Sequence, residues 1–252
     1  MAGMDFKLLQ ENWHKYGQTD PLWSIVSMPD KEGNKWTTEE FFQTGIDEVE
    51  KLLAFLKTAG LKLPSGSALD FGCGIGRVTQ PLCEHFETCH GVDIAPSMID
   101  LANQYNRYGN RCHYHLNERA DLQLFADNSI NFIYCVITLQ NMAPRYSRVY
   151  LQEFMRILAP EGLLLFQIPS EPNNWRQKVK QRVPQAWLNQ FYRLKHRGKP
   201  IMELHGLPRA EVIGLIKAGH GLLLNLKKDH RAFDEWTSYQ YCVTKAEREG
   251  AK

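Results

Sequence analysis

The stretch Leu69-Asp70-Phe71-Gly72-Cys73-Gly74-Ile75-Gly76-Arg77 decides the fold of this sequence. A short apolar run, residues 67–71, leads into three glycines spaced two apart, and a helical pattern follows over residues 76–86. A strand, a glycine turn and a helix in this order open a βαβ unit. The stretch therefore predicts the first strand of a parallel sheet.

Strands and helices continue to alternate downstream of this turn, which predicts a single doubly wound (Rossmann-like) α/β sheet. The run 130–138 is almost continuously apolar, as strands buried on both faces of a parallel sheet are. The expected strands are residues 67–71, 88–92, 112–116, 130–138, 163–168, 222–227 and 238–244, and the expected helices are residues 76–86, 96–106, 145–158 and 208–218.

The segment before the glycine turn has a different character. Thr37 and Glu40 form a capping-box pattern ahead of a helix that ends at Gly60. Residues 1–36 are rich in aromatics but broken by prolines, and they are expected to be mostly irregular with one short helix. These features divide the chain into a cap segment with its helix, residues 1–60, and a main domain, residues 61–252.

Composition excludes several classes of protein. The chain has 252 residues, 43% of them hydrophobic, and a net charge of +2, which favours no particular partner. No run approaches the roughly 18 apolar residues that cross a bilayer, and residues 1–15 lack the apolar core of a signal peptide. The six cysteines form no C-x-x-C pair, so no metal site is expected. Reduced cysteines favour a cytoplasmic location.

The details of the glycine turn favour a cationic ligand. A dinucleotide fingerprint would need glycine where Arg77 stands, so the spacing is G-x-G-x-G. Asp70 would repel a pyrophosphate but would attract a sulfonium or an ammonium group. S-adenosylmethionine (SAM) carries both cations, and its carboxylate could bind the following helix N-terminus or Arg77. The glycines would let the backbone approach this ligand without a Cβ clash.

Two further positions suit a nucleoside. Asp93 follows the second strand, where an acidic residue can accept both hydroxyls of a ribose, although it could instead cap the next helix in competition with Ser97. Asn117 and Asp121 follow the third strand and could bind the exocyclic amine of adenine, or could belong to an ordinary polar loop. A ribose is common to NAD and SAM, so Asp93 does not choose between them.

Residues 67–169 resemble the class I SAM-dependent methyltransferases. The matching pieces are residues 69–76, the run Gly91-Val92-Asp93-Ile94-Ala95-Pro96-Ser97-Met98, residues 125–132 and residues 156–162. The resemblance implies a seven-stranded sheet whose last strand is antiparallel, SAM as the cofactor and S-adenosylhomocysteine as the product. Glu161 and Asn131 depart from the common family pattern at positions remote from the cofactor. The motifs and the resemblance together give the expected cofactor-binding residues as Asp70, Gly72, Cys73, Gly74, Gly76, Arg77, Asp93, Ile94, Met98, Asn117, Asp121 and Leu122.

Candidates for contact with the methyl acceptor are less specific. Gln140 and Asn141 follow the fourth strand, and they could orient an acceptor or cap the next helix. His205 lies in a loop beside Gly206 and could be a general base or an ordinary surface histidine. His14 and Tyr16 are weaker candidates in the aromatic segment. The family often forms a substrate lid there, and the expected apolar or aromatic wall comprises Trp13, Tyr16, Trp23 and Trp36.

A basic, aromatic segment follows the fifth strand. Residues 176–199 contain eight lysines and arginines and no acid, and apolar residues recur at every fourth position. The segment is expected to be an inserted lid, about residues 171–206. Contact of residues 175–199 with a membrane surface or a lipid substrate, and contact with nucleic acid, stay as alternatives. The near-neutral net charge argues against nucleic acid.

The sequence thus predicts an enzyme that methylates an oxygen or nitrogen of a small molecule, such as a natural product, a sugar or a lipid-linked metabolite. An RNA methyltransferase that uses the basic segment and a non-catalytic SAM-binding protein are the alternatives. The sequence does not choose between a monomer and a homodimer.

Overall fold

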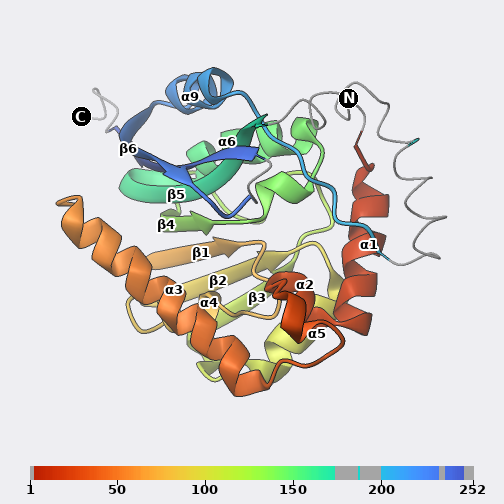
Figure 1. Cartoon of the computed structure of the whole chain (residues 1–252). Helices are drawn as coiled ribbons and strands as arrows, with labels where there is room; N and C mark the ends of the chain where they lie inside the picture. The colour runs from red at the N-terminus through yellow and green to blue at the C-terminus, as the bar shows by residue number, and fades with distance from the viewer. Residues whose placement is uncertain (1–2, 174–186, 188–199, 233–235, 247–252) are drawn as a thin grey trace.

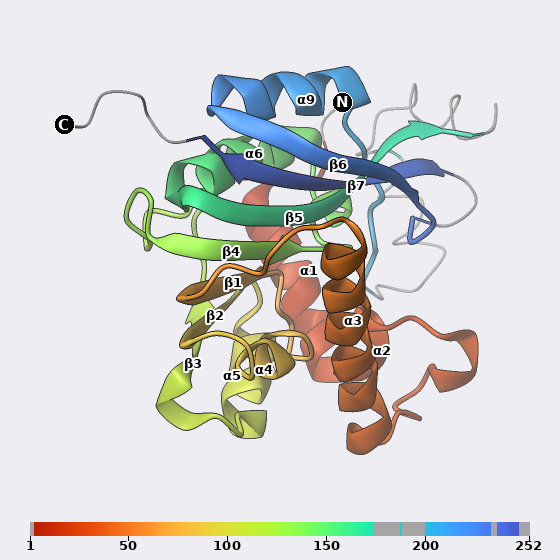
Figure 2. The same cartoon turned by 90° about the vertical axis from the view of Figure 1, so that its left-hand side faces the viewer.

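The computed structural model describes residues 3–173, 187, 200–232 and 236–246. They form a seven-stranded sheet with the strand order β3-β2-β1-β4-β5-β7-β6 (Figure 2). Neighbouring strands from β3 to β5 are parallel, whereas β7 is antiparallel to both β5 and β6. The predicted fold class is therefore confirmed. The strands are β1 (Ser67–Phe71), β2 (Thr88–Asp93), β3 (Cys112–Leu116), β4 (Ile130–Cys135), β5 (Leu158–Pro172), β6 (Gly221–Asp229) and β7 (Trp236–Lys245).

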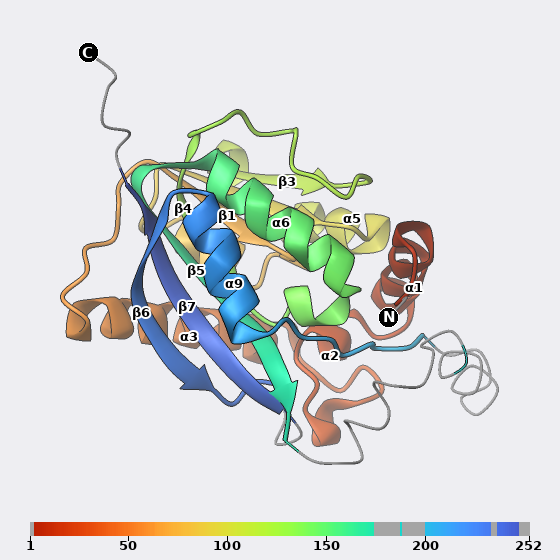
Figure 3. The ribbon, with the colours of Figure 1, turned by 90° about the horizontal axis from the view of Figure 1, so that it is seen from above.

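Helices cover both faces of the sheet. On one face, α3 packs its buried Val49, Leu52 and Leu56 against strand residues that include Phe132. On the other face, α6 and α9 lie side by side (Figure 3). The helix α3 of the expected cap segment is thus one layer of the sheet domain. The helices are α1 (Phe6–Thr19), α2 (Pro21–Ile25), α3 (Thr38–Thr58), α4 (Thr79–Leu82), α5 (Pro96–Tyr105), α6 (Pro144–Ile157) and α9 (Arg209–Ala218), with short 3-10 turns η1 (Pro29–Lys31), η2 (Gly109–Arg111) and η3 (Leu139–Asn141).

The expectation that residues 1–36 are mostly irregular was wrong. Helix α1 is 14 residues long, and Asp5 caps it by accepting a hydrogen bond from the Leu8 backbone N–H at 2.8 Å. Its apolar residues Phe6, Leu9 and Trp13 recur at helical spacing and bury one face. The prolines do not interrupt this helix, because Pro21 follows it and begins α2. Both helices lie at the carboxyl ends of the strands (Figure 1).

Two predicted elements are several residues shorter than expected, whereas β5, β6 and β7 are longer than the expected strands. Gly72, Gly74 and Gly76 have positive φ angles of 79°, 54° and 85°, so the chain turns before α4 and that helix begins only at Thr79. Strand β4 ends at Cys135 because Ile137 has a φ of 59°, in the left-handed region that no strand can use. Both differences shape the same end of the sheet.

All six cysteines are free and buried. Burial raises the pKa of the thiols of Cys73, Cys135 and Cys242 above the ordinary value. The described part of the chain contains no group of three potential metal ligands in suitable geometry. It also contains no helix with the length and apolarity that a membrane crossing requires.

Candidate functional site

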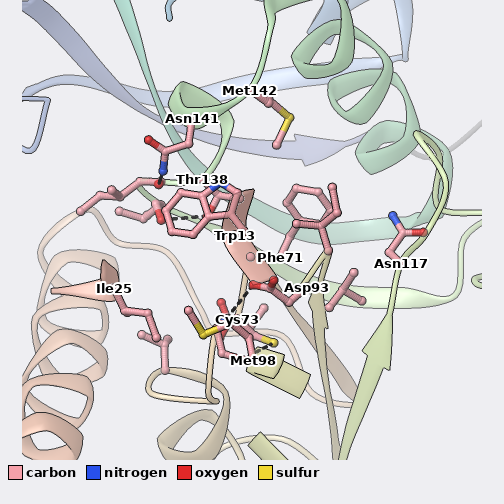
Figure 4. A pocket seen from close by; sticks show the side chains of 18 of the residues that line it. Trp13, Ile25, Phe71, Cys73, Asp93, Met98, Asn117, Thr138, Asn141 and Met142 are labelled. Atoms are coloured by element: carbon pink, nitrogen blue, oxygen red, sulfur yellow. Dashed lines mark hydrogen bonds between the residues drawn. The ribbon is translucent and has the colours of Figure 1, made fainter. Parts of the chain in front are cut away.

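A pocket opens at the carboxyl ends of β1, β2 and β4, beneath α1 and α2 (Figure 4). It contains about 1060 Å³ of space, part of which is open to solvent. Strand order reverses between β1 and β4, and ligands of open α/β sheets bind at this kind of switch point. Its walls include Asp70, Gly72, Cys73, Gly74 and Arg77 of the glycine turn, Asp93, Ile94, Met98 and Asn117 nearby, and Phe6, Leu9, Trp13, Ile25, Ile137, Thr138, Asn141, Met142 and Tyr150.

The glycine turn is held firmly at the end of β2. The backbone N–H groups of Gly72 and Cys73 donate to the carbonyl oxygen of Val92 at 2.7 and 3.0 Å. A Cβ on Gly72 would lie 2.3 Å from Thr138, and a Cβ on Gly74 would lie 2.5 Å from Ile25. These glycines therefore allow close packing of the protein around the pocket, in addition to any approach by a ligand.

Glycine is needed at position 76 for packing inside the protein. It does not line the pocket, and a Cβ there would lie 2.0 Å from the hydroxyl oxygen of Tyr114 on β3. The third glycine of the motif therefore lets the turn pack on the sheet.

Asp70 is a buried carboxyl group at the pocket wall. The Thr79 hydroxyl donates to its Oδ2 at 2.7 Å. Burial raises the pKa of Asp70 to about 6, although the hydrogen bond from Thr79 and the charge of Arg77 oppose the rise. A cationic ligand in the pocket would favour the charged form of Asp70.

Asp93 binds the glycine turn through its carboxylate. Its carboxylate accepts hydrogen bonds from the backbone N–H groups of Gly74 and Ala95, both at 2.9 Å. Burial raises the pKa of Asp93, and these backbone donors oppose the rise. Ala95 is the N-cap residue of α5, and neither Asp93 nor Ser97 forms a side-chain cap on that helix. The capping alternative for Asp93 is therefore wrong.

Arg77 has both fixed and unpaired donors. Its Nη1 donates to the carbonyl oxygen of Thr44 at 3.0 Å and lies 3.3 Å from the Thr44 hydroxyl oxygen. Its Nε is buried and has no acceptor among the residues that the structure describes. Arg77 is also one of the residues that line the pocket.

The residues after β3 are divided between the pocket and the core. Asn117 lines the pocket, and its amide donates to the Tyr150 hydroxyl at 3.2 Å and to the Asp121 carbonyl at 2.9 Å. Asp121 is not part of the pocket wall, and Leu122 is fully buried in the core. Asn117 is therefore the member of this group that the structure brings to the site.

Of the five acceptor-contact candidates, the structure brings Asn141 to the pocket. Its amide donates to the carbonyl oxygen of Ile137 at 2.7 Å. Gln140 is buried behind the wall, where its Oε1 accepts from Gln167 at 3.1 Å. His205 is also buried, with Nε2 2.8 Å from a Glu203 carboxylate oxygen.

His14 and Tyr16 lie on α1 but outside the pocket wall. The His14 Nδ1 accepts from the Ser97 backbone N–H at 3.2 Å, which ties α1 to α5. The Tyr16 hydroxyl donates to the Pro200 carbonyl at 2.9 Å, and burial raises its pKa to about 12. Both side chains hold α1 in place.

The apolar wall was only partly predicted. Trp13 lines the pocket as expected, whereas Tyr16, Trp23 and Trp36 do not. The other apolar members from the cap are Phe6, Leu9 and Ile25, and helical spacing in residues 6–13 was the signal that could have revealed two of them. The predicted lid lies largely outside the described residues, since only Trp187 of residues 174–199 is described.

Comparison with known proteins agrees with the fold. Residues 69–166 match the family model described as a methyltransferase domain. A magnesium protoporphyrin IX methyltransferase from Synechocystis PCC 6803 with bound S-adenosylhomocysteine superposes with a TM-score of 0.64 at 15% identity, over 96% of this chain and 100% of that chain. A SAM-dependent methyltransferase from Leishmania major gives a TM-score of 0.60 at 11% identity, over 94% and 83% of the two chains. No curated protein gives a significant match to the sequence.

Residues 69–166 therefore carry a methyltransferase domain, and the described chain has the fold of SAM-dependent methyltransferases, with a pocket at the switch point of its sheet.

Proposed function

We propose that this methyltransferase transfers the methyl group of SAM to an oxygen or nitrogen of a small molecule with an apolar or aromatic body. The observation that carries the proposal is the apolar part of the pocket lining. Helix α1 contributes Phe6, Leu9 and Trp13 to it, and the segment after β4 contributes Ile137 and Met142. Apolar walls with a few polar groups are typical of small-molecule sites.

The polar residues of the pocket suggest how SAM lies in it. We assign the ribose hydroxyls to Asp93, the methionyl cations to Asp70 and the adenine edge to Asn117. This arrangement directs the transferred methyl group towards the end of β4. Figure 4 shows Thr138 and Asn141 on one side of the pocket, away from Asn117.

Direct displacement at a methyl group does not require the protein to activate the leaving group. The sulfonium is its own leaving group, so the chain mainly aligns the acceptor lone pair with the S–CH₃ bond and excludes water. Trp13 and Met142 would exclude water, and the Asn141 side chain would orient a polar acceptor atom. No observation on the described residues favours RNA or a membrane as the partner, and neither is proposed.

The test is transfer of tritium from methyl-labelled SAM to small-molecule, RNA and protein fractions of a cell extract. We expect the label in apolar small molecules, and label confined to RNA or protein would contradict the proposal. Trp13→Ala should raise the acceptor KM at least tenfold while changing SAM affinity less than threefold. Lys15→Ala is the matched control, because Lys15 is exposed on the same helix. An unchanged KM in Trp13→Ala would remove α1 from the acceptor site.

A further inference from the structure

We propose that Thr44, on helix α3, is a positioning residue that holds Arg77 ready for the carboxylate of the methionyl part of SAM. The inference rests on the cofactor site proposed above and adds a residue that does not line the pocket. The direct observation is the two-point contact from Arg77 Nη1 to the carbonyl oxygen of Thr44 at 3.0 Å and to its hydroxyl oxygen at 3.3 Å.

The backbone of α3 also touches the glycine turn at this point. A Cβ on Gly45 would lie 1.9 Å from the carbonyl oxygen of Arg77, closer than any side chain could fit. Gly45 therefore lets α3 pack directly on the backbone of Arg77, while Thr44 holds its guanidinium group. Helix α3 consequently fixes both ends of this residue.

An unpaired donor of Arg77 supports a ligand at this place. The Nε is buried without an acceptor among the described residues, although buried N–H groups are nearly always paired. Arg77 forms part of the pocket wall, so a ligand carboxylate is the acceptor that would complete its hydrogen bonds. Asp70 on the same wall would attract the neighbouring ammonium group. The two side chains together match the two opposite charges of an amino acid.

Thr44 can serve Arg77 without breaking its own helix contact. The Thr44 hydroxyl donates to the Phe41 carbonyl at 2.6 Å, which leaves its oxygen lone pairs for Arg77. A valine at this position would keep the volume and remove the acceptor. Loss of the hydroxyl leaves Nη1 with the carbonyl alone and lets the guanidinium group rotate.

The experiment compares ligands that do and do not carry the carboxylate. We would measure SAM and decarboxylated SAM by calorimetry, because they differ only in that group. Thr44→Val should weaken SAM binding three- to tenfold and decarboxylated SAM binding less than twofold, and Thr44→Ser should restore the affinity for SAM. In an Arg77→Met background, Thr44→Val should change SAM affinity less than twofold. Gln43→Ala is the control, because Gln43 is an exposed neighbour that bonds Asp47 on its own helix.

An equal loss of affinity for both ligands would overturn the inference, because Thr44 would then support only the fold of the site. An unchanged affinity for SAM in Thr44→Val would overturn it as well. If the unmodified protein bound no SAM, the proposed cofactor site itself would fail, which is a different result.

Discussion

At the scale of single residues, the buried carboxylate of Asp70 lowers the stability of the protein when no ligand is bound. Its pKa is about 6 in the folded state against an ordinary value of 3.8, because burial disfavours its charge. The pKa of this carboxyl is higher in the folded state than in the unfolded state. Its contribution to the free energy of unfolding is therefore greatest below about pH 4, and it is lost as the pH rises through 6. The folded protein is therefore less stable at neutral pH than it would be with a neutral group at this position.

Asp70→Asn should raise the free energy of unfolding by about 1–3 kcal/mol at pH 7.5 and change it little at pH 4. The amide oxygen can still accept from Thr79, so the hydrogen bond is kept. The same variant should bind SAM more weakly at pH 7.5, and the affinity of the unmodified protein for SAM should fall below pH 6. Urea unfolding and calorimetry at the two pH values measure both effects. A loss of stability at pH 7.5 in the variant would contradict the account of Asp70.

At the scale of elements, helix α3 packs on the sheet and also contacts Arg77 of the proposed cofactor site. The predicted capping box at its start is present: the Thr37 hydroxyl accepts from the Glu40 N–H at 3.2 Å, and the Glu40 side chain accepts from the Thr37 N–H at 3.3 Å.

Thr37→Ala should lower the free energy of unfolding by about 1 kcal/mol. SAM affinity should change less than twofold, because the cap is at the first turn and Thr44 lies further along. Thermal unfolding measures the stability and SAM titration measures the affinity. A loss of SAM affinity with unchanged stability would contradict this prediction.

The elements also show what could be predicted from the sequence. The glycine turn, Asp70 and Asp93 stand beside motifs with a fixed place in the sheet, so their arrival at the pocket could be predicted. Tyr150 and Ile25 reach the same pocket from α6 and α2, and nothing local in the sequence distinguishes them from ordinary core residues. His205 was predicted as a loop residue beside a cleft, but Glu203 and the surrounding packing bury it. Such outcomes depend on which segments pack together, which short-range patterns do not encode.

At the scale of the whole molecule, the order of the strands places the pocket. β1 and β4 pair in register at Asp70 and Tyr134, although many residues separate them in the chain. Alternation of strands and helices predicts such a sheet, and the resemblance supplied the antiparallel last strand. Neither predicts how α1 and α2 pack on the open end of the sheet. That packing decides which acceptors can enter, so the identity of the acceptor is the property least accessible from sequence.

Because all six cysteines are buried, the rate at which they react with a thiol reagent can measure how often the fold opens. Cys73 lines the pocket, but a thiol reagent can modify the other five cysteines only when the fold opens, so their labelling rate reports the population of open molecules when closing is fast. SAM at 100 times its Kd should add about 2.7 kcal/mol to the folded state and slow labelling about 100-fold. The rate, followed by mass spectrometry, would then yield cofactor affinity before any acceptor is known. Calorimetry gives the SAM concentration that saturates the protein. If SAM at that concentration did not slow the labelling of a given cysteine, a local opening that leaves the cofactor bound would be exposing this cysteine.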